Sequence, residues 1–442
     1  MTQQSRFLVL LLAFFSGSVA SAQMNRIQFE EYDLDNGMHV ILHEDHSTPI
    51  AAVTLVYHVG SKNERSDRTG FAHFFEHLMF EGSSNIGRGE YFKMIEGIGG
   101  TINATTNFDR TLYYDIVPSH YLERALWMEA ERLTDLIIDE KGVETQRAVV
   151  KEERKQRYEN QPYGSLLEEM FKRAFTKHPY NWQPIGSAQY IDQADIQEFR
   201  DFHSTFYVPE NATLCIAGDI TPAQAKEWVK KYFGNVKRGT ADIPRVTVVE
   251  PALESEIRDT VYDNVRLPAV VFGYRTPGFK DPDFYAMSML GQVLSQGESS
   301  RMTRNLVNRE QIALAAGAFP LPTEDPGLTM MFAIPNMGVP AEKLEDAIDA
   351  EIKKMKEELI TEEEFTKLRN QVETGFVNEK TSVAGIGSSL AEYHVLYGDT
   401  DLINTELSRY LNVTREDIMR VAKKYLNVNN RIVLYYLPKA NK

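Results

Sequence analysis

The feature that most constrains the fold of this chain is an internal similarity between the sequences of its two halves. The β-rich run of residues 51–59 is paralleled by the apolar run of residues 269–274. Residues 194–217 and 416–436 share an order of features, in which an acid and an isoleucine precede an aromatic residue and a strand-like run. Both offsets are roughly 215–222 residues, and a constant offset indicates a true repeat. We predict an α+β protein of two similar domains, each a mainly antiparallel sheet covered by helices.

The predicted domain limits come from the chain start and from a segment with glycine and prolines near the middle. Residues 1–22 contain an early arginine, a short apolar run and an Ala-Ser-Ala end, which is typical of a secretory signal peptide. Gly239, Pro244 and Pro251 indicate a linker over residues 239–255. The domains expected are therefore residues 23–238 and 256–442.

Charge and apolar patterning indicate where the protein is located and which partners it can bind. The predicted signal peptide implies a periplasmic location, with secretion as the alternative. No later stretch is apolar and long enough to predict a membrane span. The net charge of −15 argues against a nucleic-acid partner and weakly favours cationic or neutral substrates. The single cysteine, Cys215, allows no intrachain disulfide.

A five-residue motif, His-Phe-Phe-Glu-His at 73–77, lies within an apolar run that predicts a buried helix. On a helix, His73 and His77 are four residues apart and share one face, where two imidazoles can bind one metal ion. Glu76 points to nearly the same side and could act as the general base of a hydrolase. The motif is the inverted form of the His-Glu-x-x-His zinc signature. The alternative is a helix with two ordinary hydrogen-bonded histidines.

A hydrolytic zinc site needs a third protein ligand. The charged helix predicted over residues 143–158 offers Glu144, Glu152 and Glu153. We expect Val149 and Val150 to face the core, and Glu153 lies on their side of the helix. This pattern modestly favours Glu153 over Glu152, although a solvated charged face is the usual role of such a helix.

The run of residues 69–80 resembles the pitrilysin and mitochondrial-processing-peptidase family of zinc metallopeptidases, and most closely its exported bacterial members. Residues 100–113 and 147–153 match the next two blocks of that family, and weaker similarity continues through residues 207–219 and 299–302. The resemblance implies one Zn²⁺ ion held by His73, His77 and Glu153. It also implies that Glu76 deprotonates the zinc-bound water and passes the proton to the leaving amine.

The resemblance further implies a substrate site and a position next to the metal. Peptide or unfolded protein would join an exposed strand edge at Asn103, Ala104 and Thr105 by main-chain hydrogen bonding. Gln146 occupies a position where family members often have glutamate, so it could donate a hydrogen bond but could not act as a base. The N-terminal domain would then be catalytic and the C-terminal domain a non-catalytic relative.

A departure from the family pattern concerns partners. Many members carry an Arg and a Tyr in the second half that bind substrate, and the matching positions here are Val307 and Leu314. We therefore expect a related subunit of similar length to supply them, in a heterodimer, with a homodimer as the competing arrangement. Two functions remain open: a zinc endopeptidase, and a chamber-forming or chaperone-like subunit with little activity alone.

Overall fold

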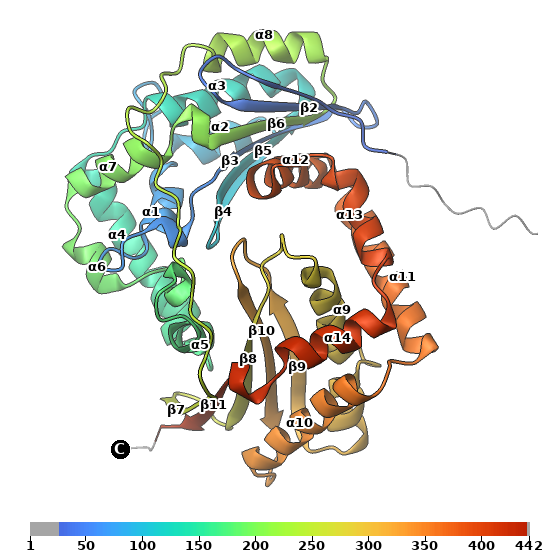
Figure 1. Ribbon diagram of the computed structural model, residues 1–442. Coiled ribbons are helices and arrows are strands. Elements are labelled where there is room, and N and C mark those ends of the chain that lie inside the picture. The colour runs from blue at the N-terminus through green and yellow to red at the C-terminus, as the bar shows by residue number, and fades with distance from the viewer. Residues whose placement is uncertain (1–25, 440–442) are drawn as a thin grey trace, which may run out of the picture.

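The computed structural model describes residues 26–439, and Figure 1 shows that they form two sheets, one in each half of the chain. The predicted signal peptide, residues 1–22, lies outside the described residues. The first sheet has the order β1-β2-β6-β3-β5-β4. Its strands are β1 (Glu30–Asp33), β2 (His39–Glu44), β3 (Ile50–Tyr57), β4 (Thr101–Thr106), β5 (Thr111–Pro118) and β6 (Ala212–Gly218). All neighbours in this order are antiparallel except β2 and β6.

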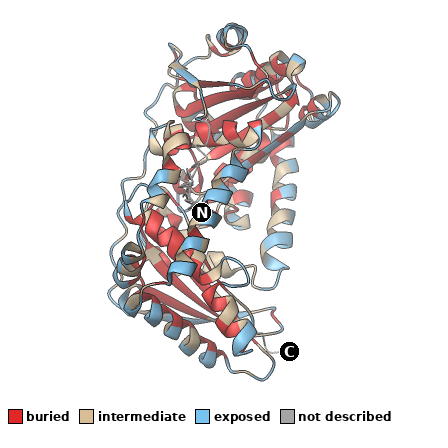
Figure 2. Cartoon of the chain, turned by 90° about the vertical axis from the view of Figure 1, so that its right-hand side faces the viewer, coloured by how far each residue is buried: buried red, intermediate tan, exposed pale blue. Residues whose placement is uncertain are grey.

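The second sheet has the order β7-β11-β8-β10-β9, in which β7 and β11 are parallel and the other neighbours antiparallel. Its strands are β7 (Ile257–Asp263), β8 (Ala269–Thr276), β9 (Ala313–Leu321), β10 (Gly327–Pro335) and β11 (Arg431–Pro438). Both sheets are therefore mainly antiparallel, as the sequence predicts. Figure 2 shows that buried residues concentrate on the strands and on the helix faces turned toward them.

Helices complete each half. In the first half they are α1 (Phe71–Leu78), α2 (Glu90–Glu96), α3 (Leu122–Thr134), α4 (Glu140–Arg154), α5 (Leu166–Ala174), α6 (Ala188–Gln193), α7 (Ile196–Phe206) and α8 (Pro222–Phe233). In the second half they are α9 (Asp283–Ser295), α10 (Ala341–Glu357), α11 (Glu362–Glu379), α12 (Val383–Glu392), α13 (Leu402–Leu411) and α14 (Arg415–Tyr425). No helix among residues 26–439 is both long and apolar enough to cross a bilayer.

The repeat is confirmed at the level of whole elements. The matched pairs β3 and β8, α7 and α14, and β6 and β11 start at residues 50 and 269, 196 and 415, and 212 and 431, so each pair is 219 residues apart. The pair α3 and α10 starts at 122 and 341, with the same separation. Two similar halves therefore account for the described chain. Residues 239–255, the predicted linker, contain no helix or strand.

One helix from each half packs on the sheet of the other half. Ile386 and Leu390 of α12 pack with Ile41, Val56 and Cys215 on the inner face of the first sheet. In return, apolar side chains of α5 cover one face of the second sheet: Met170, Phe171 and Ala174 pack with Val271, Met330 and Leu434. Each such fully buried Leu, Ile or Phe stabilises the fold by about 1.5–3 kcal/mol. The exchange therefore fixes the two sheets relative to one another.

Candidate metal centre

The helix that carries the motif is anchored by its aromatic face. Phe71, Phe74 and Phe75 of α1 are buried against Phe199 and Phe202 of α7, with ring centroids 4.7–6.1 Å apart. Residues at this spacing occupy one side of a helix, so the two histidines are directed to the other side, toward α4. The preceding Gly70 has φ of +97°, a conformation that favours glycine, and it allows the chain to enter the helix from a tight loop.

A buried carboxylate, Glu64, fixes the start of α1. Its oxygens accept hydrogen bonds from the backbone N–H groups of Gly70 at 2.9 Å and Ala72 at 2.8 Å, and from the Trp182 indole at 3.1 Å. Burial raises the pKa of Glu64 to about 8, although these N–H donors act in the opposite direction. Sequence reasoning missed this residue because it lies in a charged loop. An acid a few residues before a helix start is the signal that could have found it.

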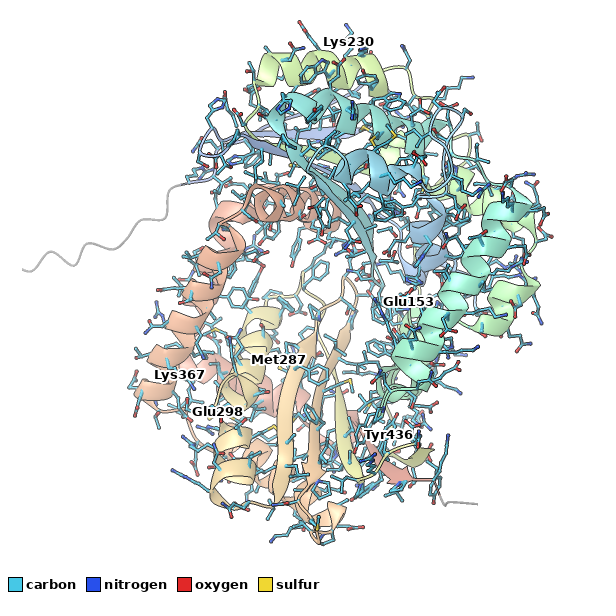
Figure 3. All side chains as sticks on the ribbon, turned by 180° about the vertical axis from the view of Figure 1, so that it is seen from behind. Glu153, Lys230, Met287, Glu298, Lys367 and Tyr436 are labelled. Carbon is cyan, nitrogen blue, oxygen red and sulfur yellow. The ribbon has the colours of Figure 1, made fainter. Side chains whose placement is uncertain are left out.

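Three side chains from α1 and α4 converge at one point. Nε2 of His77 lies 3.2 Å from Oε2 of Glu153, and Nε2 of His73 lies 3.6 Å from the same oxygen. The two imidazole rings are 4.8 Å apart at 75°. Figure 3 labels Glu153 on α4, which runs beside α1. The structure thus brings together the three residues that the sequence nominates as metal ligands.

The donor set fits a zinc ion. Ligand atoms that each lie about 2.0–2.2 Å from a tetrahedral ion are about 3.3–3.6 Å from one another. The spacings of 3.2 and 3.6 Å between Glu153 and the two histidines are close to this range. Burial, followed by the proximity of His77, lowers the pKa of His73 to about 4, so its imidazole is neutral as a ligand must be. Nδ1 of His73 is buried and has no hydrogen-bond partner among the described residues.

The position of Glu153 follows from the buried side of α4. Val143 and Val150 are fully buried, and Glu153 is three residues beyond Val150, so the three share a face. The prediction that Val149 faces the core is wrong: this residue is 44% exposed. Oε1 of Glu153 forms an ion pair with Arg157 at 2.9 Å, which leaves Oε2 for the histidines. Its hydrogen bond with His77 is the main reason that the pKa of Glu153 lies below its usual value.

Glu76 lies between the metal ligands and the edge of the first sheet. Burial raises the pKa of its carboxyl group, while a hydrogen bond from Thr106 and the charge of His77 act against this shift. Thr106 ends strand β4. A carboxyl group next to the convergent ligands is placed to accept a proton from a water molecule and to release it again.

Strand β4 is the outermost strand of the first sheet, so one of its backbone edges faces no other strand among the described residues. Asn103 and Thr105 are exposed, and Ala104 between them is buried. The Thr105 carbonyl accepts from Nη1 of Arg110 at 2.9 Å. The three residues predicted to contact substrate therefore form an available strand edge that ends beside Glu76.

Gln146 shares the buried side of α4 but contacts a different group. Its Nε2 donates to Oε1 of Glu81 at 2.6 Å, and Arg88 forms an ion pair with the other oxygen of Glu81. Glu81 follows α1 by three residues, so Gln146 ties the end of the motif helix to α4.

A second group of possible metal ligands, Glu31, His39 and His394, lies where β1 and β2 meet the second half of the chain. The rings of His39 and His394 are stacked 3.4 Å apart at 5°. Both nitrogens of His39 already face carboxylates, Asp33 at 2.8 Å and Glu31 at 3.3 Å. Imidazole lone pairs lie in the ring plane, so parallel rings do not direct them to one ion. The site between α1 and α4 is therefore the better metal centre.

The described residues of the second half offer no matching site. Helix α9, which follows β8 as α1 follows β3, contains no histidine. Val307 is half-buried and packs against the second core, whereas Leu314 at the start of β9 is 53% exposed. Neither side chain can form the polar contacts of an Arg or a Tyr.

The sequence of this chain is similar to peptidase family models and to proteins named as peptidases. A family model described as "Insulinase (Peptidase family M16)" matches residues 39–186, and "Peptidase M16 inactive domain" matches residues 193–372. The "Zinc protease PqqE" of Helicobacter pylori is 31% identical over 96% of both chains. The "Probable mitochondrial-processing peptidase subunit beta, mitochondrial" of Arabidopsis thaliana is 25% identical over 89% of this chain and 75% of its own length.

The fold of this chain is also similar to solved structures. "The crystal structure of a protease from Helicobacter pylori" superposes with a TM-score of 0.89 at 30% identity, covering 93% of this chain and all of that one. A "peptidase M16 inactive domain" from Pseudomonas fluorescens has a TM-score of 0.82 at 16% identity, over 94% of this chain and 99% of that one, which is a likeness of fold alone.

Proposed function

The chain belongs to the insulinase family of peptidases, family M16, and on this premise we propose that it is a zinc-dependent endopeptidase that cleaves peptides or unfolded protein segments. The observation that carries the proposal is the convergence of His73, His77 and Glu153 beside Glu76. Loss of any one of these side chains would leave an incomplete hydrolytic site.

In this proposal His73, His77 and Glu153 would hold one Zn²⁺ ion. When bound, zinc lowers the pKa of a water and polarises a carbonyl group. Glu76 takes a proton from the attacking water and hands it to the nitrogen of the leaving amine. The hydroxyl of Thr106 orients the Glu76 carboxylate, and Arg157 occupies the oxygen of Glu153 that does not face the histidines.

The substrate would add to the edge of β4 as an extra strand. Main-chain hydrogen bonds made along Asn103, Ala104 and Thr105 hold an extended peptide with little dependence on its sequence. This mode requires a substrate segment without fixed structure. The end of β4 at Thr106 then places the peptide backbone next to Glu76.

We also propose that a related subunit completes the site by supplying an Arg and a Tyr, since Val307 and Leu314 cannot. The Arabidopsis relative is itself named as a subunit, which supports this arrangement. A periplasmic location, proposed from residues 1–22 alone, is part of the same hypothesis. The test is to dilute the purified chain to nanomolar concentration and to measure its mass by light scattering. If the chain is a monomer and its specific activity does not fall on dilution, neither a heterodimer nor a homodimer is needed.

The test compares the wild-type protein with Glu76→Gln. Wild type should contain one zinc per chain by elemental analysis and, without the related subunit, cleave a mixture of unstructured peptides slowly but measurably, and a chelator should stop cleavage until zinc is restored. Glu76→Gln should retain zinc and lose at least about 100-fold in kcat/KM. Full activity of Glu76→Gln would overturn the mechanism. A zinc-loaded wild type that cleaves nothing but suppresses aggregation of unfolded proteins would favour the chaperone-like alternative.

A further inference from the structure

A pocket of about 400 Å³ lies where the turn after β4 meets the helices of the second half. Its walls come from residues 107–110, the start of α9, the end of α11, and α12 with the π-helical turn η7 (Tyr393–Tyr397) and α13. In Figure 1 helices α11, α12 and α13 form an arc on the opposite side of the molecule from α4 and α5. The pocket is therefore separate from the metal centre, but the β4–β5 turn that lines it directly follows Thr106, which contacts Glu76.

The lining of this pocket is rich in aromatic rings. Phe279 stacks on Tyr397 with centroids 4.5 Å apart, and Tyr410 packs edge-on against Phe376 at 5.6 Å. These rings come from α11, η7, α13 and the loop before α9, so ring faces and edges surround the space from several sides. The faces of aromatic rings carry partial negative charge and attract cations.

Two carboxylates of the pocket lack a cation partner. Glu406 is 7% exposed and accepts from the Tyr393 hydroxyl, and Glu379 at the exposed rim accepts from Ser389 at 3.1 Å. Burial raises the pKa of Glu406, and the charge of Glu379 adds to the shift. Neither residue forms an ion pair within the described part of the chain, although the charges of Arg409 and Lys380 act on Glu406 from a distance.

The cations nearest to Glu406 are held elsewhere. The ammonium group of Lys380 donates to the Ile403 carbonyl and lies 5.3 Å from the Phe376 ring. Arg409 donates to the Tyr285 hydroxyl at 3.3 Å and faces Asp399 at 3.9 Å. A guanidinium or ammonium group from outside the chain could therefore occupy the space between the two carboxylates and the rings.

Arg110 connects this pocket to the edge of β4. Its Nη1 donates to the Thr105 carbonyl at 2.9 Å, and its Nε forms an ion pair with Glu392 of the pocket at 2.5 Å. The charge of Arg110 also acts on Glu76. A peptide that lies along β4 and continues past Thr106 thus arrives at the pocket.

We propose that this pocket binds an arginine or lysine side chain of the peptide substrate and makes the protein selective for cationic peptides. The proposal rests on the peptidase function for its consequence in cleavage, but binding itself does not require zinc. Aromatic faces combined with two carboxylates suit a cation and disfavour both apolar and acidic side chains.

The experiment uses pairs of fluorescent peptides that differ only by arginine or citrulline at one position, which is moved along an otherwise neutral sequence. Zinc-free protein should bind the arginine peptide at least about tenfold more tightly than its citrulline twin at one or two positions. The preference should fall at higher ionic strength. Zinc-loaded protein should show the same preference in kcat/KM.

Variants connect the preference to the pocket. Glu379→Gln is an exposed change that the fold tolerates, and it should reduce the arginine preference several-fold; Glu406→Gln should do the same. Glu363→Gln, exposed at the other end of α11, should leave the preference intact. Equal binding of both peptides by the zinc-free wild type, or an unchanged preference in Glu379→Gln, would overturn the pocket assignment. Selective binding without any cleavage by zinc-loaded protein would instead contradict the peptidase function alone.

Discussion

Nζ of Lys62, in the first half of the chain, lies 2.7 Å from Oε2 of Glu324, in the second half. Lys62 is 6% exposed and also faces Asp109 at 2.9 Å and Asp325 at 3.1 Å. The loop that joins β9 to β10 is thus held against the loop that precedes the motif helix. One buried cation and three carboxylates link the halves within a short distance of the β4–β5 turn.

Replacing Lys62 should therefore destabilise the protein strongly. Lys62→Met leaves buried carboxylates without their cation, and breaking such a group typically costs about 3–5 kcal/mol. Lys280 contacts the same Glu324 at 2.8 Å but is half exposed, so Lys280→Met should cost no more than about 1 kcal/mol. Urea unfolding of both variants measures the difference. Equal and small losses would show that the link between the halves does not depend on Lys62.

The same network should make stability depend on pH below the neutral range. Burial alone would raise the pKa of Glu324, but the hydrogen bond with His58 and the charge of Lys62 hold it well below its usual value. A carboxyl group with a depressed pKa stabilises the folded state above its unfolded pKa of about 4.3 and loses that contribution as the pH falls further. In zinc-free protein, the stability difference between wild type and Glu324→Gln should therefore shrink from pH 6 to pH 3. A constant difference would contradict this linkage.

The sequence predicts local features of this protein well because they depend on short-range patterns. The motif helix, the charged helix with Glu153 and the repeat of strands all follow from spacing along the chain. The role of Lys62 does not, because a charge in a loop predicts a solvated side chain unless its distant partners, here Glu324 and Asp325, are known. The sequence also does not predict that α5 and α12 each cover the sheet of the other half, since an apolar helix face does not specify which sheet it covers.

Zinc content should distinguish Glu153 from its neighbour. Glu153→Gln removes the charged ligand that faces both histidines, so it should lower zinc affinity by at least about 10-fold and abolish peptide cleavage. Glu152 is exposed on the same helix, and within residues 26–439 its carboxylate accepts a hydrogen bond from Gln156 alone, at 3.1 Å, so Glu152→Gln should keep one zinc per chain. Elemental analysis after dialysis, with circular dichroism as a check of folding, measures both. If Glu152→Gln loses zinc and Glu153→Gln keeps it, the third ligand is Glu152 and not Glu153.

Gln146 should not tolerate replacement by glutamate. Its Nε2 donates to Glu81 at 2.6 Å, so Gln146→Glu turns a hydrogen bond into a contact between two carboxylates, which Arg88 can only partly compensate. We expect a loss of about 1–3 kcal/mol at pH 7. The loss should be smaller at pH 5, because two adjacent carboxylates favour the uptake of a proton, and a shared proton restores the hydrogen bond. Gln156→Glu, an exposed change of the same kind beside Glu152, should cost no more than about 0.5 kcal/mol. Denaturation at both pH values measures these differences, and a Gln146→Glu protein as stable as wild type would show that Glu81 is free to turn away.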